Sequence, residues 1–213
     1  KSSLVGQSLR SYMVMPGQPV WMSRNYQQFA DEGYARNVIA YRAINMVASA
    51  VSSIPLILYT RGRNGKRELM SHPVLSLMRR PNPTQSTSDF LTALVHYKLI
   101  SGNAYIHATA PSGEAPRELH LLRPDRVQVI AGKNALPAAY RYTVDKSHVD
   151  FPVDKITGRS RILHIKQFHP ANDWYGMSPL EAAAYSIDQH NQASSWNQAL
   201  MQNGARPSGA LVV

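Results

Sequence analysis

The stretch Gly176-Met177-Ser178-Pro179-Leu180-Glu181 stands at the start of the longest part of the chain without proline or glycine. Ser178 is a suitable N-cap residue, because its hydroxyl can accept a hydrogen bond from a backbone N–H of the first turn. Pro179 suits the first helical position, and Glu181 lies three residues after the cap, as in a capping box. These residues predict that a helix begins here.

The predicted end of this helix is equally clear. Asn203-Gly204 can leave a helix through a left-handed turn, and Pro207 cannot continue one. The pattern therefore predicts a single long helix within residues 176–204, of about 25 residues and about 37 Å. A typical helix has only about 11–12 residues.

The middle of this helix is polar. Residues 188–195 read Asp-Gln-His-Asn-Gln-Ala-Ser-Ser, whereas apolar residues recur at helical spacing before and after them. A helix with such a middle is not expected to lie wholly against the core of its own domain. It could bridge, project, or pack against copies of itself. A long surface helix with an irregular apolar face is the alternative.

Length and composition favour a globular protein. The chain has 213 residues, enough for one large domain or two small ones, and 44% of them are hydrophobic. No run approaches the roughly 18 apolar residues of a membrane span, and no signal peptide is visible. The absence of cysteine excludes disulfides and zinc–thiolate sites. Because the first residue is Lys1, we expect the native start to be missing.

The positive charge is concentrated in the first half. Residues 1–100 hold 12 Lys and Arg against 4 Asp and Glu, and residues 101–213 hold 11 against 9, which together give the net charge of +10. This balance favours a polyanionic partner such as nucleic acid, or acidic patches on another protein. No aromatic residues are interleaved with the basic ones as a base-stacking platform requires.

Periodicity divides the first half into an arm and a helical region. Residues 1–30 lack a regular apolar pattern and are expected to form an arm or a flexible leader. Residues 31–53 show helical spacing, and Pro55 ends that helix. Residues 56–60 are expected to form a strand, with a tight turn at Asn64-Gly65 into a short partner strand. The tip of this hairpin is basic and is a possible contact for phosphate or an acidic partner, through Arg61, Arg63, Lys66 and Arg67.

The second half changes from helical to alternating spacing. A short helix from Pro73 is followed by a rigid turn, Pro81-Asn82-Pro83, and by a helix capped by Thr87 or Ser88 and closed by Gly102-Asn103. Five strands follow, with a break at Pro124-Asp125. They are expected at residues 104–109, 119–122, 127–130, 140–144 and 161–165, with a loop at 150–154. The fold class is therefore α+β, with a mostly antiparallel sheet and packed helices.

A search for catalytic chemistry finds nothing. Neither the dinucleotide fingerprint nor the P-loop occurs, and no Gly-x-Ser-x-Gly elbow is present. His164, His169 and Asp173 are close in sequence, but their spacing matches no metal-ligand pattern. Asp150 and Asp154 are not placed to form an acid pair with separated pKa values. We therefore expect no enzyme, no metal and no cofactor.

The order of several short motifs resembles the bacteriophage portal protein family of tailed phages and prophages. The resemblance covers residues 34–213. It rests on Ser53-Ile54-Pro55-Leu56, His72-Pro73-Val74-Leu75-Ser76-Leu77, Arg80-Pro81-Asn82-Pro83, Ser101-Gly102-Asn103-Ala104-Tyr105, Leu119 to Val127, Ile162-Leu163-His164-Ile165, Gly176-Met177-Ser178-Pro179-Leu180 and Asn203 to Gly209.

The resemblance implies a domain plan and a function. Residues 1–30 would be an N-terminal arm, 31–175 a wing-like domain, 176–204 a stem-like helix and 205–213 the start of a clip-like segment. Family members continue beyond such a segment, so the chain would be truncated on its C-terminal side. The family implies a ring, typically dodecameric, at one capsid vertex of the virion, assembled in the bacterial host cytoplasm. Double-stranded DNA would pass through it without sequence preference.

The resemblance also implies partners. They are other copies of the chain, the terminase large subunit, the major capsid protein and the head–tail connector, with no membrane. Ring neighbours could hydrogen-bond along the polar middle of the helix. The possible interface residues are Asp188, Gln189, Asn191, Gln192 and Ser195. The alternative is a monomeric basic nucleic-acid-binding domain.

Overall fold

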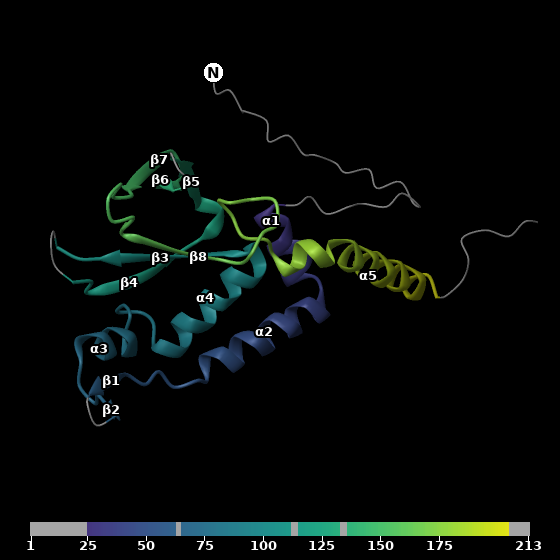
Figure 1. Ribbon diagram of the computed structural model, residues 1–213. Coiled ribbons are helices and arrows are strands. Elements are labelled where there is room, and N and C mark those ends of the chain that lie inside the picture. Colours follow the sequence, from purple (N-terminus) through teal and green to yellow (C-terminus); the bar gives the residue numbers. More distant parts are fainter. Residues whose placement is uncertain (1–24, 63–64, 112–114, 133–135, 205–213) are drawn as a thin grey trace, which may run out of the picture.

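The computed structural model describes residues 25–62, 65–111, 115–132 and 136–204. It confirms the α+β fold class, with helices packed beside antiparallel sheets (Figure 1). The single sheet expected from the sequence is divided into a hairpin and two three-stranded sheets. Their strand orders are β1-β2, β4-β3-β8 and β5-β6-β7.

The first helical region differs from the prediction at its start. Tyr26–Gln28 form a short helix, α1, which leads into a π-helix over Phe29–Ala35. Helix α2 spans Val38–Ser52 and not 31–53, because the Asn37 side chain caps it by accepting from the backbone N–H groups of residues 39 and 40. Phe29 is buried, so packing begins before residue 31.

The next helices have nearly the predicted ends. Helix α3 spans Pro73–Arg79, and helix α4 spans Thr87–Ser101. Ser86 caps α4, in place of the predicted Thr87 or Ser88, because Ser86 and Asp89 form a reciprocal capping box.

The hairpin β1-β2 is shorter than predicted. Strand β1 covers Tyr59–Gly62 and pairs with β2, Gly65–Glu68, so residues 56–58 lie before the strand. The connecting residues, including Arg63 and Asn64 of the predicted turn, lie outside the described residues. Gly65 has a φ of 106°, as expected for a residue at such a turn.

The two larger sheets contain one strand that the sequence did not reveal. In the first sheet, β3 (Asn103–Thr109) pairs with β4 (Glu118–Leu122) and with β8 (Ile162–Lys166). In the second, β6 (Pro137–Val144) pairs with β5 (Val127–Ala131) and with β7 (Ser147–Pro152). Strand β7 includes part of the predicted loop at 150–154. It is an exposed edge strand with only Phe151 half-buried, so it lacks the apolar alternation that identifies a strand.

Two hydrophobic cores hold these elements together. One lies among the helices and includes Phe29, Ala40, Ile44, Ile100, Leu180, Ala184 and Ile187. The other lies between the two larger sheets and includes Tyr105, Leu122, Val127, Tyr140, Val153 and Ile162. The first core fixes the beginning of the last helix, α5, which spans Pro179–Gln202.

Candidate functional site at the long helix

The beginning of α5 is held by a close approach of two glycines. Gly102 ends α4 in the left-handed region with a φ of 77°, and its carbonyl accepts from the backbone N–H of Gln167 at 2.8 Å. A Cβ on Gly102 would lie 2.4 Å from the carbonyl oxygen of Gly176, and a Cβ on Gly176 would lie 2.2 Å from that of Gly102. Both positions therefore require glycine.

The side-chain amide of Asn103 joins the same two segments. Its Oδ1 accepts from the backbone N–H of Gly176 at 2.7 Å and faces Nε2 of His164 at 2.9 Å. Its Nδ2 donates to the carbonyl oxygens of Ser101 at 2.9 Å and Gly176 at 3.3 Å. Asn103 is buried, so these contacts satisfy polar groups that water does not reach. We call Gly102, Asn103, His164, Gly176 and Ser178 the root node.

Ser178 connects the root node to the helix itself. Its hydroxyl accepts from the backbone N–H of Leu180 at 3.0 Å, which confirms the predicted cap, and it donates to the carbonyl of Leu99 at 2.9 Å. The backbone N–H of Glu181 bonds to the carbonyl of Ser178 at 3.0 Å and not to its hydroxyl. The first turn of α5 is thereby tied to the last turn of α4.

A second polar contact holds the helix further along. The Asn37 side chain donates to Oδ1 of Asn191 at 3.0 Å and lies 3.2 Å from Nδ1 of His190. Asn191 donates to the backbone carbonyl of Glu32 at 2.9 Å. Asp188 is buried. Of the predicted interface residues, Asp188 and Asn191 thus face their own chain.

The rest of α5 extends away from the body of the protein, as Figure 1 shows. Every residue from Gln192 to Gly204 is exposed. One face of the helix carries Gln189, Gln192, Trp196 and Leu200 at steps of three and four residues, and we call it the distal face. It points away from the side that Leu180, Ala184 and Ile187 bury. Ser195 is also exposed but lies to one side of this face.

An apolar groove of about 420 Å³ lies between α2 and α5. The side chain of Ile39 on its rim is 62% exposed. The groove is lined mainly by Ile39, Ala43, Val47, Leu99, Ala183 and Ile187. Surfaces of this kind mark sites where another surface packs.

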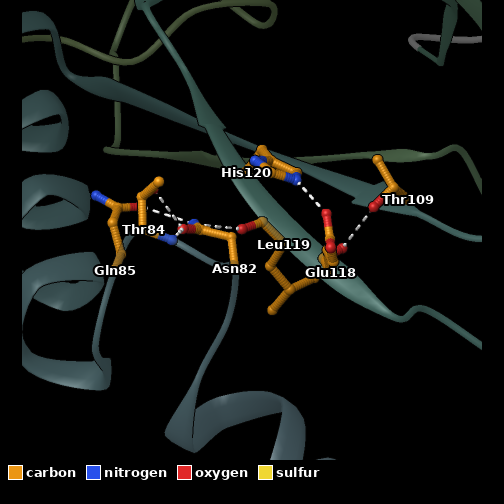
Figure 2. Close-up of polar contacts among 7 residues, drawn as sticks. All are labelled: Asn82, Thr84, Gln85, Thr109, Glu118, Leu119 and His120. Carbon is orange, nitrogen blue, oxygen red and sulfur yellow. Dashed lines mark hydrogen bonds and ion pairs between the residues drawn. The ribbon is translucent and has the colours of Figure 1, made fainter.

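The predicted rigid turn at residues 81–83 has a separate role (Figure 2). The side chain of Asn82 donates to Oε1 of Gln85 at 2.8 Å and to the carbonyl of Leu119 at 3.0 Å. Its Oδ1 accepts from the backbone N–H and the hydroxyl of Thr84. The carbonyl of Pro81 accepts from the N–H of Leu119 at 2.7 Å. The turn therefore attaches the α3–α4 connection to β4. The carbonyl of Pro83 accepts a hydrogen bond from the Arg80 side chain.

The remaining predicted motif residues are not part of the root node. Pro124 and Asp125 lie in a 3₁₀-helix, where Asp125 accepts two hydrogen bonds from Arg123. Asn203 and Gly204 end α5, and Gly204 has a φ of 65°. Pro207 lies outside the described residues. Arg61, Lys66 and Arg67 are exposed on the β1-β2 hairpin, at the end of the molecule opposite α5 in Figure 1.

Histidine and acidic side chains do not gather into a metal site in the described ranges, where no group of three could hold an ion. None of the helices in those ranges is both long and apolar enough to cross a bilayer. The sequence did not reveal the cap at Asn37 or the contact between His164 and Asn103. Asn37 could have been found as an N-cap before an apolar helical pattern, whereas His164 has an alternating strand pattern that does not reveal its partner.

We expect the stability of the protein to fall between pH 6.5 and pH 4 because of His164. Burial, with a smaller effect of Lys166, lowers the pKa of His164 to about 4. As the pH falls, the unfolded state therefore binds the proton before the folded state does. The contribution of neutral His164 to the free energy of unfolding is complete above pH 6.5 and is lost as the pH falls through 4. The loss is at most about 3 kcal/mol. Urea denaturation of the protein and of His164→Gln at several pH values measures it, and identical pH profiles would contradict the assignment.

The architecture is that of an α+β scaffold, in which a body of sheets and helices carries one projecting helix. The model of the phage portal protein family matches residues 39–213, and the chain belongs to this family. An uncharacterised protein of Rickettsia bellii (strain RML369-C) is 40% identical over 182 residues, and one of Rickettsia felis (strain ATCC VR-1525 / URRWXCal2) is 42% identical over 183. Each match covers 85% of this chain and 46% of the relative.

Solved structures of gene transfer agent particles show the same fold. A chain from the neck of an empty particle with C6 symmetry is 41% identical, with a TM-score of 0.76 over 92% of this chain and 51% of that one. A chain from the neck of a native particle with C12 symmetry is 39% identical, with a TM-score of 0.74 over 91% and 49%. The chain thus spans about half the length of the relatives it matches.

Proposed function

We propose that this chain is part of a portal subunit that forms a ring, dodecameric in the virion, at one vertex of a capsid. The ring is a conduit for double-stranded DNA during packaging and ejection. It is also the attachment point for the terminase large subunit, the major capsid protein and the head–tail connector. It acts as a structural component rather than an enzyme and is assembled in the cytoplasm of the bacterial host.

The observation that carries this proposal is the contrast along α5. The root node and Asn37 fix the direction of the helix, yet all of its residues from Gln192 onward are exposed. A helix of 24 residues spans about 36 Å, so its exposed half extends well beyond the body. An isolated monomer gains little from holding a helix rigidly in water. A ring does benefit from a rigidly held helix, because each neighbour packs against that helix in a fixed orientation.

A closed ring also requires two different surfaces on each subunit, because its contacts are head-to-tail. We assign one to the distal face of α5, with Gln189, Gln192, Trp196 and Leu200, and the other to the apolar groove between α2 and α5. Trp196 is 73% exposed, and aromatic residues of this kind commonly anchor interfaces. The C6 and C12 particle necks to which the chain is similar support a closed assembly.

Native mass measurement and negative-stain imaging of the full-length protein test the proposal. Rings with a central hole are the expected result. A monomer that binds DNA tightly with a steep salt dependence would contradict it and favour the basic nucleic-acid-binding domain instead.

A mixing experiment tests the two assigned surfaces. We expect Trp196→Glu and Ile39→Glu each to abolish rings, because each places a charge in an interface that must exclude water. A mixture of the two variants should stop at a heterodimer, since one intact contact remains between the unaltered surface of each partner. Sedimentation velocity distinguishes these states.

The control for this experiment is Ile156→Glu, because Ile156 is 95% exposed and lies in the loop after β7. It makes the same chemical change outside both surfaces and should leave the rings intact. Rings formed by either single variant, or a mixture that remains monomeric, would show that the surfaces are wrongly assigned.

A further inference from the structure

A second groove lies at the other end of the molecule from α5. It has a volume of about 320 Å³ and is formed by residues 52–57 and 68–70, by α3 and by the first residues of α4. We call it the hairpin groove. Its apolar lining includes Ile54, Leu56, Ile57, Met70, Leu75 and Met78. Met70 is 75% exposed, so this lining is open to solvent.

The β1-β2 hairpin beside the groove is basic, and Arg79 of α3 is part of the groove lining. Arg61 and Lys66 lie directly opposite each other in the β1-β2 pair, whereas Arg67, the next residue on β2, lies on the other face of the hairpin. Directly opposite side chains share one face of a hairpin, where like charges are destabilising. In the described parts of the chain, these three cations and Arg79 of the groove wall have no ion-pair partner, and Glu68 is the acid beside them. An anionic partner would relieve this repulsion.

We propose that the hairpin groove binds an acidic, amphipathic segment of another protein. Its apolar side chains would occupy the groove, and its carboxylates would pair with Arg61, Lys66 and Arg79. Apolar contacts supply affinity in such an arrangement, whereas the complementary charges orient the segment and speed its association.

Two features favour a protein over DNA. The phosphates of a duplex would pair with the cations but leave the apolar lining of the groove uncovered. In addition, β1, β2 and α3, which lie around the groove, are at the end of the molecule opposite α5 (Figure 1). If α5 faces the channel of the proposed ring, the groove faces the periphery, away from the DNA path. Only this second argument rests on the proposed function.

Fluorescence anisotropy of the full-length protein with a labelled peptide tests the proposal. The probe is a 14-residue peptide of glutamate and leucine, with leucines at helical spacing. We expect saturable binding that weakens at least 10-fold in the variant Arg61→Gln/Lys66→Gln/Arg79→Gln, which we call the hairpin variant. Met70→Glu should also weaken it at least 10-fold. Because Met70 is exposed, this substitution should leave the fold intact, which thermal melting checks.

Matched controls distinguish binding in the groove from simple attraction to the net charge of the protein. The variant Lys146→Gln/Lys155→Gln/Arg159→Gln removes the same charge from the loops after β6 and β7 and should bind the peptide normally. A peptide with serine in place of leucine has the same charge and should bind at least 10-fold more weakly. Equal binding of both peptides, or unchanged binding by Met70→Glu, would overturn the groove as the site.

Other outcomes also decide the question. A 20-base-pair duplex that binds as tightly as the peptide, and loses affinity in the hairpin variant, would make this a nucleic-acid surface. Absence of peptide binding would overturn the proposal as well. Ring formation by the unaltered protein, followed by native mass, is a separate result: rings without peptide binding contradict only this inference, and peptide binding without rings contradicts only the proposed function.

Discussion

Replacing Gly102 with alanine is expected to destabilise the folded protein by at least about 3 kcal/mol. The substitution has two costs. The positive φ of Gly102 is unfavourable for any residue with a Cβ, and that Cβ would lie 2.4 Å from the carbonyl oxygen of Gly176. This neighbour is backbone that Asn103 and the start of α5 hold in place, so it cannot move aside cheaply. Urea denaturation followed by tryptophan fluorescence measures the change.

Gly204→Ala is the matched control for Gly102→Ala. Gly204 also has a positive φ, of 65°, but a Cβ there would meet nothing within 4 Å. Its cost is therefore that of the backbone conformation alone, about 1 kcal/mol. Gly176→Ala supplies the complementary case, because it adds the clash without the positive φ. If Gly102→Ala costs no more than Gly204→Ala, the close approach of the two segments is not rigid.

The sequence predicted local structure well wherever one residue's own chemistry decides it. Ser178 and Pro179 start a helix by hydrogen bonding and by a preset φ, and Gly204 ends one by tolerating a positive φ. These requirements involve only neighbours along the chain, so α5 was found with its ends nearly correct. The same holds for Gly102 at the end of α4.

The sequence did not reveal contacts whose partners are distant along the chain. Nothing near Gly102 or Gly176 shows that the two meet across 73 intervening positions, and nothing near Asn191 shows that it bonds to Glu32 and Asn37. The sequence makes Asn191 a possible interface residue because the helix is polar there. The structure instead satisfies this polar residue within its own chain, which restricts the proposed interface to the exposed residues of α5.

Replacing Asn103 with alanine is expected to cost about 3–5 kcal/mol and to reduce ring formation strongly. The substitution removes all four side-chain hydrogen-bonding contacts of Asn103. It leaves the N–H and carbonyl of Gly176 without these partners at a buried site. Because those bonds fix where α5 begins, a folded variant would also present its distal face in a less defined direction.

Two measurements separate stability from assembly in the Asn103→Ala variant. Urea denaturation gives the loss of stability, and native mass at a temperature where the variant is still folded gives the fraction in rings. Asn203→Ala is the control, since Asn203 is exposed at the far end of the same helix, and it should change stability by less than about 0.5 kcal/mol. A stable Asn103→Ala protein that forms rings at normal yield would show that α5 is directed by its apolar contacts with α4 and the π-helix. In that case the root node would not be what orients the helix.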